Sequence, residues 1–453
     1  MPTTSETSPS RPWPLSLFAP APPAPIIATD PQEIRDGFRH WQPRILFAST
    51  LGYAVFYFVR ANLSVAMPAI ERDLHFSKTD LGFFLTAHGV IYGLSKFFNG
   101  FLGDRSNARI FMAVGLILSA ICNFVFGSSS LAIVMGVTWM LNGYFQGMGF
   151  PPCARLLTHW FPPRQLATKM SIWNMSHCIG ASLIVILCGY LVTFSWRLCF
   201  YVPGIIALIT TVYLLVFLRD TPESLGLPNV DALEENAEPR SPAKDQTEES
   251  YGFVLLNYVF NNPWIWLMAL ANFFVYTIRY SILNWAPTFL TQDKHIYITS
   301  AGWMTAAFEG CGMIGAMVAG WLTDKYFGGR GPRVALIGMI LCGVSLFAFW
   351  RLPAQTVTTS TLLLCAIGFF IYIPQCLVGI TAAKLATRRA AAAAVGLTGL
   401  FAYLSTLLSG VGLGWLVQHH GWPAGFKALI FVAGFASLLF AIAWPASAEG
   451  NHV

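Results

Sequence analysis

The stretch LFASTLGYAVFYFVRANLSVAMP (residues 46–68) is long and apolar enough to cross a bilayer, yet it carries Arg60 in its interior. A second stretch, WIWLMALANFFVYTIRYSILNWAP (264–287), repeats the arrangement around Arg279. An arginine keeps its proton, and at the centre of a membrane helix it costs at least about 2.5–3.5 kcal/mol. A chain that retains two of them is expected to use them. Gripping an anion inside a polar cavity is the natural use.

The two stretches also share the spacing of their neighbours: Tyr57 and Tyr276 stand three residues before the arginines, and Pro68 and Pro287 stand eight after them. The composition around them is that of a membrane protein, with 453 residues, 55% hydrophobic and 11% charged, and a mean hydropathy of +0.58. Soluble domains average about 25% charged residues. No nucleophile–base pair, metal-ligand spacing or nucleotide loop stands out, so we expect neither an enzyme nor a cofactor.

Apolar stretches of roughly 20 residues, the length that spans a bilayer, recur about twelve times. We expect an all-α membrane protein with spans near 45–68, 80–101, 109–128, 131–153, 167–192, 197–218, 263–290, 299–323, 333–351, 357–384, 390–417 and 423–445. The nine cysteines are scattered through these stretches with no CxxC, and they are expected to be reduced.

The positive charges indicate the topology. Of the 27 Lys and Arg, eighteen fall in the N-terminal segment or in alternate loops on its side, six fall on the other side, and three are intramembrane. The positive-inside rule therefore predicts that both termini are cytoplasmic. The net charge of +6 is in this view a topology signal, and no nucleic-acid partner is expected.

The chain divides into two halves that repeat each other. Residues 219–262 are polar and acidic and are expected to form a partly disordered cytoplasmic linker. Asp104 and Asp324 are 220 residues apart and Arg60 and Arg279 are 219 apart, so one internal duplication explains both spacings. We therefore predict two pseudo-symmetric six-helix bundles. The expected boundaries are a cytoplasmic tail at 1–40 with a short interfacial helix near Ile34–Trp41, bundles at 41–218 and 263–445, and a C-terminal tail at 446–453.

The duplicated loops GFLGDRSNAR (100–109) and GWLTDKYFGGRGPR (320–333) resemble the cytoplasmic loop motif of the major facilitator superfamily. In that superfamily the substrate binds near the midplane between two rocking halves. The expected gating residues are Asp104, Arg105, Asp324 and Lys325. The two aspartates would latch the cytoplasmic side by facing a helix N-terminus or an arginine, the alternative being that they are ordinary loop charges.

Phosphate or a phosphate ester suits the arginine pair, because a guanidinium fork matches phosphate oxygens and two forks can hold a dianion. The structural alternative is that a buried carboxylate neutralises each arginine. Glu309 is the only clear intramembrane acid, and it cannot neutralise Arg60, Arg279 and Lys96 together. Lys96 is either a further cation of the cavity or the partner of Glu309. His177 either acts on the ligand or packs between helices. Tyrosine hydroxyls are expected at cavity depth at Tyr53, Tyr57, Tyr92, Tyr276, Tyr372 and Tyr403.

Longer blocks resemble the organophosphate:phosphate antiporter family, nearest its hexose-phosphate sensor and transporter branch. They include YGLSKFFNGFLGDRSNARIFMAVGLIL (92–118), NGYFQGMGFPPCARLLTHWF (142–161), SIWNMSHCIG (171–180), RDTPESLGLP (219–228) and FEGCGMIGAMVAGWLTDKYFGGRGPR (308–333). The resemblance implies a bacterial inner-membrane antiporter of inorganic phosphate and a sugar or glycerol phosphate. It places the family's phosphate-gripping arginines on Arg60 and Arg279, its binding histidine on His177 and its intramembrane lysine on Lys96.

The chain departs from that family at Ala61, where relatives commonly have lysine, and at Asn284, where they have aspartate. Lys384 stands where several relatives have an acid. These changes leave phosphate recognition intact and the organic half of the substrate open. One alternative function is a receptor that signals external hexose phosphate to a partner kinase. A proton-driven symporter using Glu309 or His177 is another. The fold is expected to work as a monomer.

Overall fold

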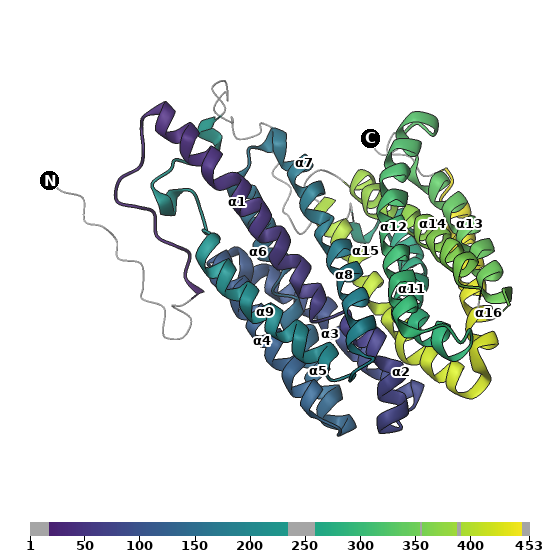
Figure 1. Ribbon diagram of the computed structural model, residues 1–453. Helices are drawn as coiled ribbons and strands as arrows, with labels where there is room; N and C mark the ends of the chain where they lie inside the picture. The colour runs from purple at the N-terminus through teal and green to yellow at the C-terminus, as the bar shows by residue number, and fades with distance from the viewer. Residues whose placement is uncertain (1–17, 234–258, 354–355, 387–390, 446–453) are drawn as a thin grey trace.

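The computed structural model describes residues 18–233, 259–353, 356–386 and 391–445. Over these residues the chain is helical and forms no strand. Figure 1 shows the helices of the first half, in purple to teal, as one bundle beside the helices of the second half, in green to yellow. The expected all-α fold of two helical bundles is confirmed.

Nine α-helices make up the first half, and several join in pairs to cross the membrane. They are α1 (Pro31–Phe58), α2 (Asn62–Leu74), α3 (Lys78–Asp104), α4 (Ala108–Ser128), α5 (Ala132–Gln146), α6 (Phe150–Trp160), α7 (Pro163–Asn174), α8 (Ser176–Leu191) and α9 (Leu198–Phe217). Helix α1 begins at Pro31, capped by the Asp30 side chain. The short separate helix expected near Ile34–Trp41 is therefore part of α1, because the helix continues unbroken into the first span.

The second half contains α11 (Pro263–Gln292), α12 (Ile298–Tyr326), α13 (Gly331–Arg351), α14 (Val357–Leu385), α15 (Ala391–Leu404), the π-helix η5 (Leu407–Gly412) and α16 (Leu413–Ile442). Helix α16 turns back at Gly421, whose φ of 75° is accessible to glycine at little cost. Between the halves, η2 (Glu223–Leu225) and η3 (Val230–Leu233) pack against the first bundle, so the start of the expected linker is structured.

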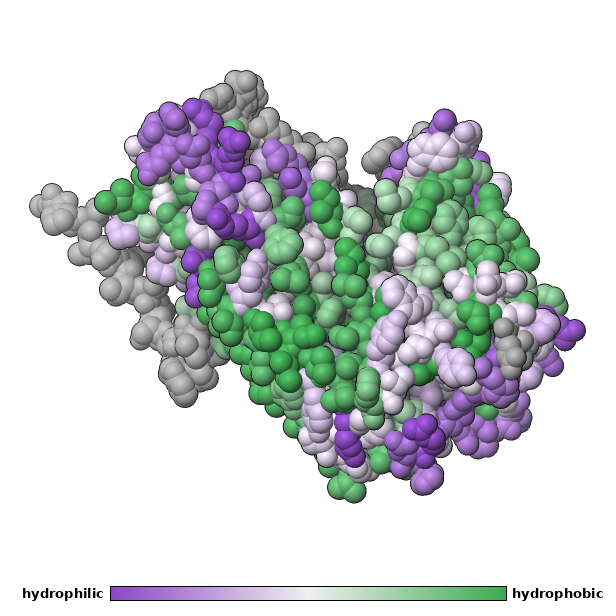
Figure 2. Space-filling model, in the orientation of Figure 1, coloured by the Kyte–Doolittle hydropathy of each residue, from purple (hydrophilic) through white to green (hydrophobic). Residues whose placement is uncertain are grey.

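Among the described residues, nine helical stretches are long and apolar enough to cross a membrane. The last of them, Ala393–Ile442, contains the turn at Gly421 and so passes twice. The remaining two of the twelve expected spans are α3, which carries Lys96, and the pair α5–α6, whose members are each shorter than 18 residues. Figure 2 shows apolar side chains over the middle of the visible face and hydrophilic ones gathered at both ends, as a membrane-spanning protein requires.

The two halves are packed together at one end. We call the end where α1 begins and α16 finishes the terminal end, and the opposite end the distal end. Towards the distal end, a Cβ added to Gly82 of α3 would lie 2.5 Å from the carbonyl oxygen of Gly410 in η5. A Cβ on Gly302 of α12 would lie 2.7 Å from the carbonyl oxygen of Val185 in α8. These backbones approach so closely that only glycine fits.

A hydroxyl from the first half completes the π-helix of the second. Thr86 of α3 donates to the carbonyl of Thr406 at 2.7 Å and accepts from the amide of Val411 at 2.9 Å. A π-bulge displaces backbone groups from regular pairing. The Thr86 hydroxyl provides a partner for one such carbonyl and one such amide. Nearer the distal surface, Gln292 donates to Glu71 at 2.8 Å across the same interface. At the terminal end, Figure 2 shows a hollow between the halves.

The close approach at Gly82 predicts the effect of adding one carbon atom. We expect Gly82→Ala to force α3 away from η5 and weaken the distal closure. Spin labels introduced bioorthogonally at Arg72 and His420, which are exposed on opposite halves, should then report a longer mean distance. Gly100→Ala, on the same helix but with no atom within 4 Å of the added carbon, is the matched control. An unchanged distance in Gly82→Ala would show that this contact does not hold the distal end closed.

Candidate functional site

The two arginines sit on different kinds of backbone. Arg279 lies within the continuous helix α11, whereas Arg60 lies in the three-residue break between α1 and α2. The duplication predicts equivalent surroundings for the two arginines, but in the structure their backbone surroundings differ. Only the first arginine stands where a helix is interrupted.

Three buried asparagines hold this break, and we call them the asparagine cluster: Asn62, Asn123 and Asn142. Asn123 and Asn142 donate to the carbonyl of Val59 at 2.9 and 2.8 Å. Asn62 donates to Asn123 Oδ1 and to the carbonyl of Cys199, both at 2.8 Å. A carbonyl released from a helix inside a membrane must be satisfied internally, because leaving it bare costs several kcal/mol. The cluster therefore fixes the position of Arg60. Our sequence reasoning missed it, although asparagines inside apolar spans were the available signal.

Arg60 faces aromatic rings. Its Cζ atom lies 4.2 Å from the ring centroid of Tyr92 and 5.1 Å from that of Tyr57. Such cation–π contacts stabilise a desolvated guanidinium without neutralising it. Among the described residues, no carboxylate lies within ion-pairing distance of Arg60. Its charge is therefore not compensated by a described acid of this chain.

Arg279 has a carboxylate partner. Its Nη2 atom lies 3.4 Å from Glu309 Oε1 and donates to the Tyr372 hydroxyl at 2.6 Å. Tyr372 in turn donates to Glu309 Oε2 at 2.5 Å. All three side chains are buried. Arg279 is therefore paired within the chain, because α12 and α14 bring an acid and a hydroxyl against it.

This pairing also decides the open question about Lys96. Its Nζ atom lies 4.3 Å from the ring of Phe150 and 5.6 Å from that of Tyr403, and Glu309 pairs with Arg279 instead. Three cations share this region with one described acid, so two positive charges are in excess. The structural alternative, neutralisation by a buried carboxylate, thus applies to one arginine of the pair.

His177 lies near the start of α8 and is half-buried. Its Nδ1 atom bonds to the backbone carbonyl of Asn174, which can only accept, so Nδ1 carries the hydrogen. The other nitrogen, Nε2, lies 3.2 Å from Cys178 Sγ. A neutral His177 therefore offers a lone pair at Nε2, and it can donate to an anion there only when protonated.

The predicted residues gather at one place between the halves. Each arginine contacts side chains of this place: Arg60 Cζ lies 5.1 Å from the ring centroid of Tyr57, and Arg279 donates to the Tyr372 hydroxyl. The Cζ atom of Arg279 also lies 5.6 Å from the ring centroid of Tyr280. The Tyr57 and His177 rings are 5.8 Å apart, and Cys178 Sγ lies 3.7 Å from the Tyr372 hydroxyl across the interface. The other predicted tyrosines lie around these contacts. The ring centroid of Tyr53 lies 4.7 Å from that of Trp173 and 5.8 Å from that of Tyr57, and the centroids of Tyr92 and Tyr403 are 4.8 Å apart. The Tyr276 ring centroid lies 5.7 Å from Arg279 Cζ. Tyr280 was not predicted.

Asp324 of the predicted gate makes no latch contact with the residues that the structure describes. Asp324 is exposed, and Lys325 lies 5.0 Å from the ring of Trp321. Arg105 is exposed too, and the side chain of Asp104 lies outside the described part. The latch therefore stays a prediction.

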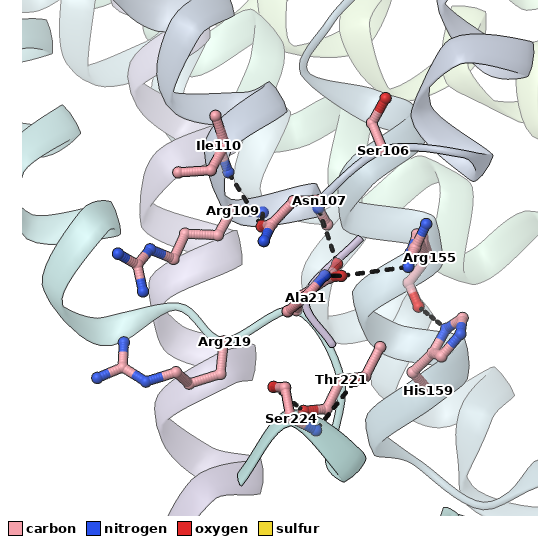
Figure 3. A network of polar contacts seen from close by, with 12 residues as sticks. Ala21, Ser106, Asn107, Arg109, Ile110, Arg155, His159, Arg219, Thr221 and Ser224 are labelled. Atoms are coloured by element: carbon pink, nitrogen blue, oxygen red, sulfur yellow. Dashed lines mark hydrogen bonds and ion pairs between the residues drawn. The ribbon is translucent and has the colours of Figure 1, made fainter. Parts of the chain in front are cut away.

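A different acid, Asp220, occupies a helix N-terminus at the terminal end. Its carboxylate accepts from the amide of Ala108 at 2.8 Å and from that of Ala21 at 3.0 Å. Arg155 Nη2 lies 3.3 Å from it, and the Asp220 side chain is fully buried. Figure 3 shows this network of α4, α6 and the segments around Ala21 and Arg219. Sequence reasoning placed Asp220 in a disordered linker and so missed it.

Comparison with known proteins agrees with the fold. The Major Facilitator Superfamily matches residues 49–295 and 268–452. A probable hexose phosphate transport protein of Chlamydia pneumoniae is 40% identical over 445 residues, which cover 95% of this chain and 97% of the relative. The membrane sensor protein UhpC of Escherichia coli (strain K12) is 36% identical over 431 residues, which cover 93% of this chain and 96% of the relative. A bacterial homologue of the human lysosomal transporter Spinster, solved in an inward-facing and occupied conformation, superposes with a TM-score of 0.71 at 15% identity, over 89% of this chain and 97% of that one.

The asparagine cluster predicts a coupling between fold stability and anion binding. We expect Asn123→Leu to cost about 1 kcal/mol, the scale of one hydrogen bond inside a membrane, and to loosen the backbone that carries Arg60. The measurement is the melting temperature in detergent and its rise on adding phosphate, which should shrink. Asn99→Leu removes a buried amide that bonds to Ser95 at 2.7 Å and not to Val59, so its phosphate response should persist. An intact phosphate response in Asn123→Leu would contradict the role of the cluster.

Proposed function

Since the chain belongs to the organophosphate:phosphate antiporter family of the Major Facilitator Superfamily, we propose that it exchanges inorganic phosphate for a phosphorylated organic anion, with hexose 6-phosphate as that anion. The chain is a multi-pass membrane transporter of this family and not an enzyme. The observation that carries the proposal is the guanidinium of Arg60, which has no carboxylate partner among the described residues. Contacts through Tyr57, His177, Cys178 and Tyr372 join it to Arg279 of the other half. An anion at this place would meet one guanidinium from each half.

Phosphate matches this site better than a carboxylate does. A guanidinium presents a planar fork of N–H donors, and phosphate offers oxygens for two forks at once. The excess of two positive charges equals the charge of a phosphate dianion. In our proposal Lys96 is the third of these cations, at the edge of the site, and His177 lines the site.

Glu309 gives the site an internal competitor. Its carboxylate and the Tyr372 hydroxyl hold Arg279 when no ligand is bound, so an arriving anion must share or displace them. The exchange of partners lets the anion leave again, because the carboxylate is ready to return. A site without such a competitor would bind more tightly and release more slowly.

The closed distal end and the hollow at the terminal end suggest the transport cycle. An anion enters from the terminal end, bridges Arg60 and Arg279 and draws the halves together there, while the glycine contacts at the distal end separate. The anion can shift this equilibrium only by binding the states differently, and simultaneous contact with both arginines supplies that difference. Without an anion the like charges oppose closure, so flux takes the form of exchange.

The orientation follows from the distribution of basic residues. By sequence, eighteen Lys and Arg fall in the N-terminal segment or in alternate loops on its side, against six on the other side. We therefore propose that the terminal end, where α1 begins, faces the cytoplasm of a bacterial cell. The described conformation is then open to the cytoplasm. The chain is proposed to act as a monomer in the inner membrane.

A second candidate function is sensing. The Escherichia coli relative described above is named a membrane sensor protein, and a sensor would share the arginine pair. Proteoliposomes loaded with phosphate distinguish the two. A carrier takes up labelled phosphate in exchange, whereas a sensor binds hexose phosphate without sustained flux and requires a signalling partner, such as a kinase. Competition by glucose 6-phosphate, glycerol 3-phosphate and phosphoglycerate then identifies the organic substrate.

The arginine forks predict a loss that charge alone does not repair. We expect Arg60→Lys and Arg279→Lys each to abolish phosphate exchange in proteoliposomes, because lysine keeps the charge but offers no planar fork. Arg351→Lys, at the exposed end of α13, serves as the control and should exchange normally. Near-wild-type exchange in either site variant would refute the proposal.

The competitor role of Glu309 predicts opposite effects on binding and on rate. Glu309→Gln should bind phosphate about tenfold more tightly, because Arg279 loses its anionic partner and the site loses a repelling charge. The exchange rate should fall, since nothing displaces the bound anion. Equilibrium binding and proteoliposome exchange measure the two, with Asp293→Asn in the distal loop as the control. If exchange instead loses its pH dependence while affinity is unchanged, the symport alternative is favoured.

A further inference from the structure

Two arginines at the terminal end, outside the central site, face the same way. Arg109 is the second residue of α4, and Arg219 follows the end of α9 by two residues. In Figure 3 both side chains extend to one side of the polar network, away from Arg155. Both are half-buried. We call them the arginine clamp.

The clamp has no described counterion. Arg219 Nη1 donates to the carbonyls of Val216 and Leu218, both at 2.7 Å, and its Cζ atom lies 5.0 Å from the ring centroid of Trp41. Arg109 Nε is buried and has no hydrogen-bond partner among the described residues. Partial burial, and then the charge of Arg109, lower the pKa of the Arg219 guanidinium. The two charges therefore repel each other with no acid described between them.

Asp220 keeps the clamp together without neutralising it. The carboxylate follows Arg219 directly in the chain, yet it turns inward and bonds to the amide of Ala108, next to Arg109. It also accepts from Ala21 and Arg155. This bond ties the end of α9 to the start of α4, where a cation such as Arg109 is opposed by the helix dipole. An unfavourable placement of two cations is thus built into the fold.

An apolar strip leads up to the clamp. The most exposed side chains of α9 include Ile205, Ile209, Val212 and Val216, which are 51%, 65%, 63% and 53% exposed. Their spacing of four, three and four residues places them on one face of the helix. This face begins deep in the span and ends beside Arg219. Trp41, an aromatic residue of the type enriched at the membrane interface, lies at the same level.

We propose that Arg109 and Arg219 bind the headgroup phosphate of an anionic phospholipid, whose acyl chain lies along the exposed face of α9. An apolar strip ending in a pair of cations matches the two parts of a lipid, whereas a free anion would have no use for the strip. Basic pockets between membrane helices on the cytoplasmic side are known to hold anionic headgroups. A zwitterionic headgroup carries its own cation and compensates the clamp less well. This inference is independent of the proposed transport activity.

The test uses the full-length chain in detergent with added lipid, and native mass spectrometry with melting temperature as the readouts. For Arg109→Gln combined with Arg219→Gln, the apparent affinity for phosphatidylglycerol should fall about thirtyfold. The matched control removes two exposed charges from the same end in the other half, Lys325→Gln with Lys384→Gln, and should bind as the wild type does. Phosphatidylcholine should stabilise wild type and variant equally.

Two further measurements control for misfolding and distinguish binding of a lipid from binding of a free anion. The pair Arg109→Lys with Arg219→Lys retains both charges and should keep most of the phosphatidylglycerol binding. Inorganic phosphate at matched concentration should not displace the lipid; full displacement would assign the clamp to a soluble anion and overturn the proposal. An unchanged affinity in the glutamine pair, or an equal loss in the control pair, would overturn it as well.

Discussion

Inside a bilayer a peptide carbonyl has no water to bond to, so any interruption of a membrane helix must be satisfied by the protein itself. This chain interrupts its first span at Arg60 and meets the requirement with the amides of Asn123 and Asn142, which both donate to Val59. Asn62 locks Asn123 in place and anchors the group to Cys199 at the start of α9. The position of the arginine therefore depends on asparagines from α2, α4 and α5 together with a backbone carbonyl of α9.

The second half stabilises its buried arginine by a different arrangement. Arg279 stays within a regular helix and is stabilised by Glu309 and Tyr372. One guanidinium of the central pair is thus held by aromatic rings and the other by a carboxylate and a hydroxyl. This asymmetry gives the site an excess of positive charge together with an internal competitor. In the proposed function, the first property attracts an anion and the second releases it.

Much of this could be predicted, and the failures share a cause. The composition, the recurrence of apolar stretches and the duplicated spacing predict the helical fold and bring Arg60, Arg279, Lys96 and His177 towards one place. The pairing of Glu309 with Arg279, in preference to Lys96, depends on how α12 and α14 pack against α11. Tyr280 was overlooked for a similar reason, since its proximity to Arg60 exists only across the interface between the halves. Contacts between distant segments leave no local pattern.

The sequence by itself determined that the chain spans a membrane, that it consists of two repeated halves, and that each half brings an arginine to mid-depth. These are consequences of side-chain hydropathy and spacing, which act locally. Only the tertiary structure decided that a described carboxylate pairs with Arg279 and none with Arg60, and that Asp220 is a buried helix cap where a partly disordered linker was expected. It also decided that the halves close on glycines at the distal end. Burial and hydrogen bonding arise from segments that meet in space, and residues far apart in the chain set them jointly.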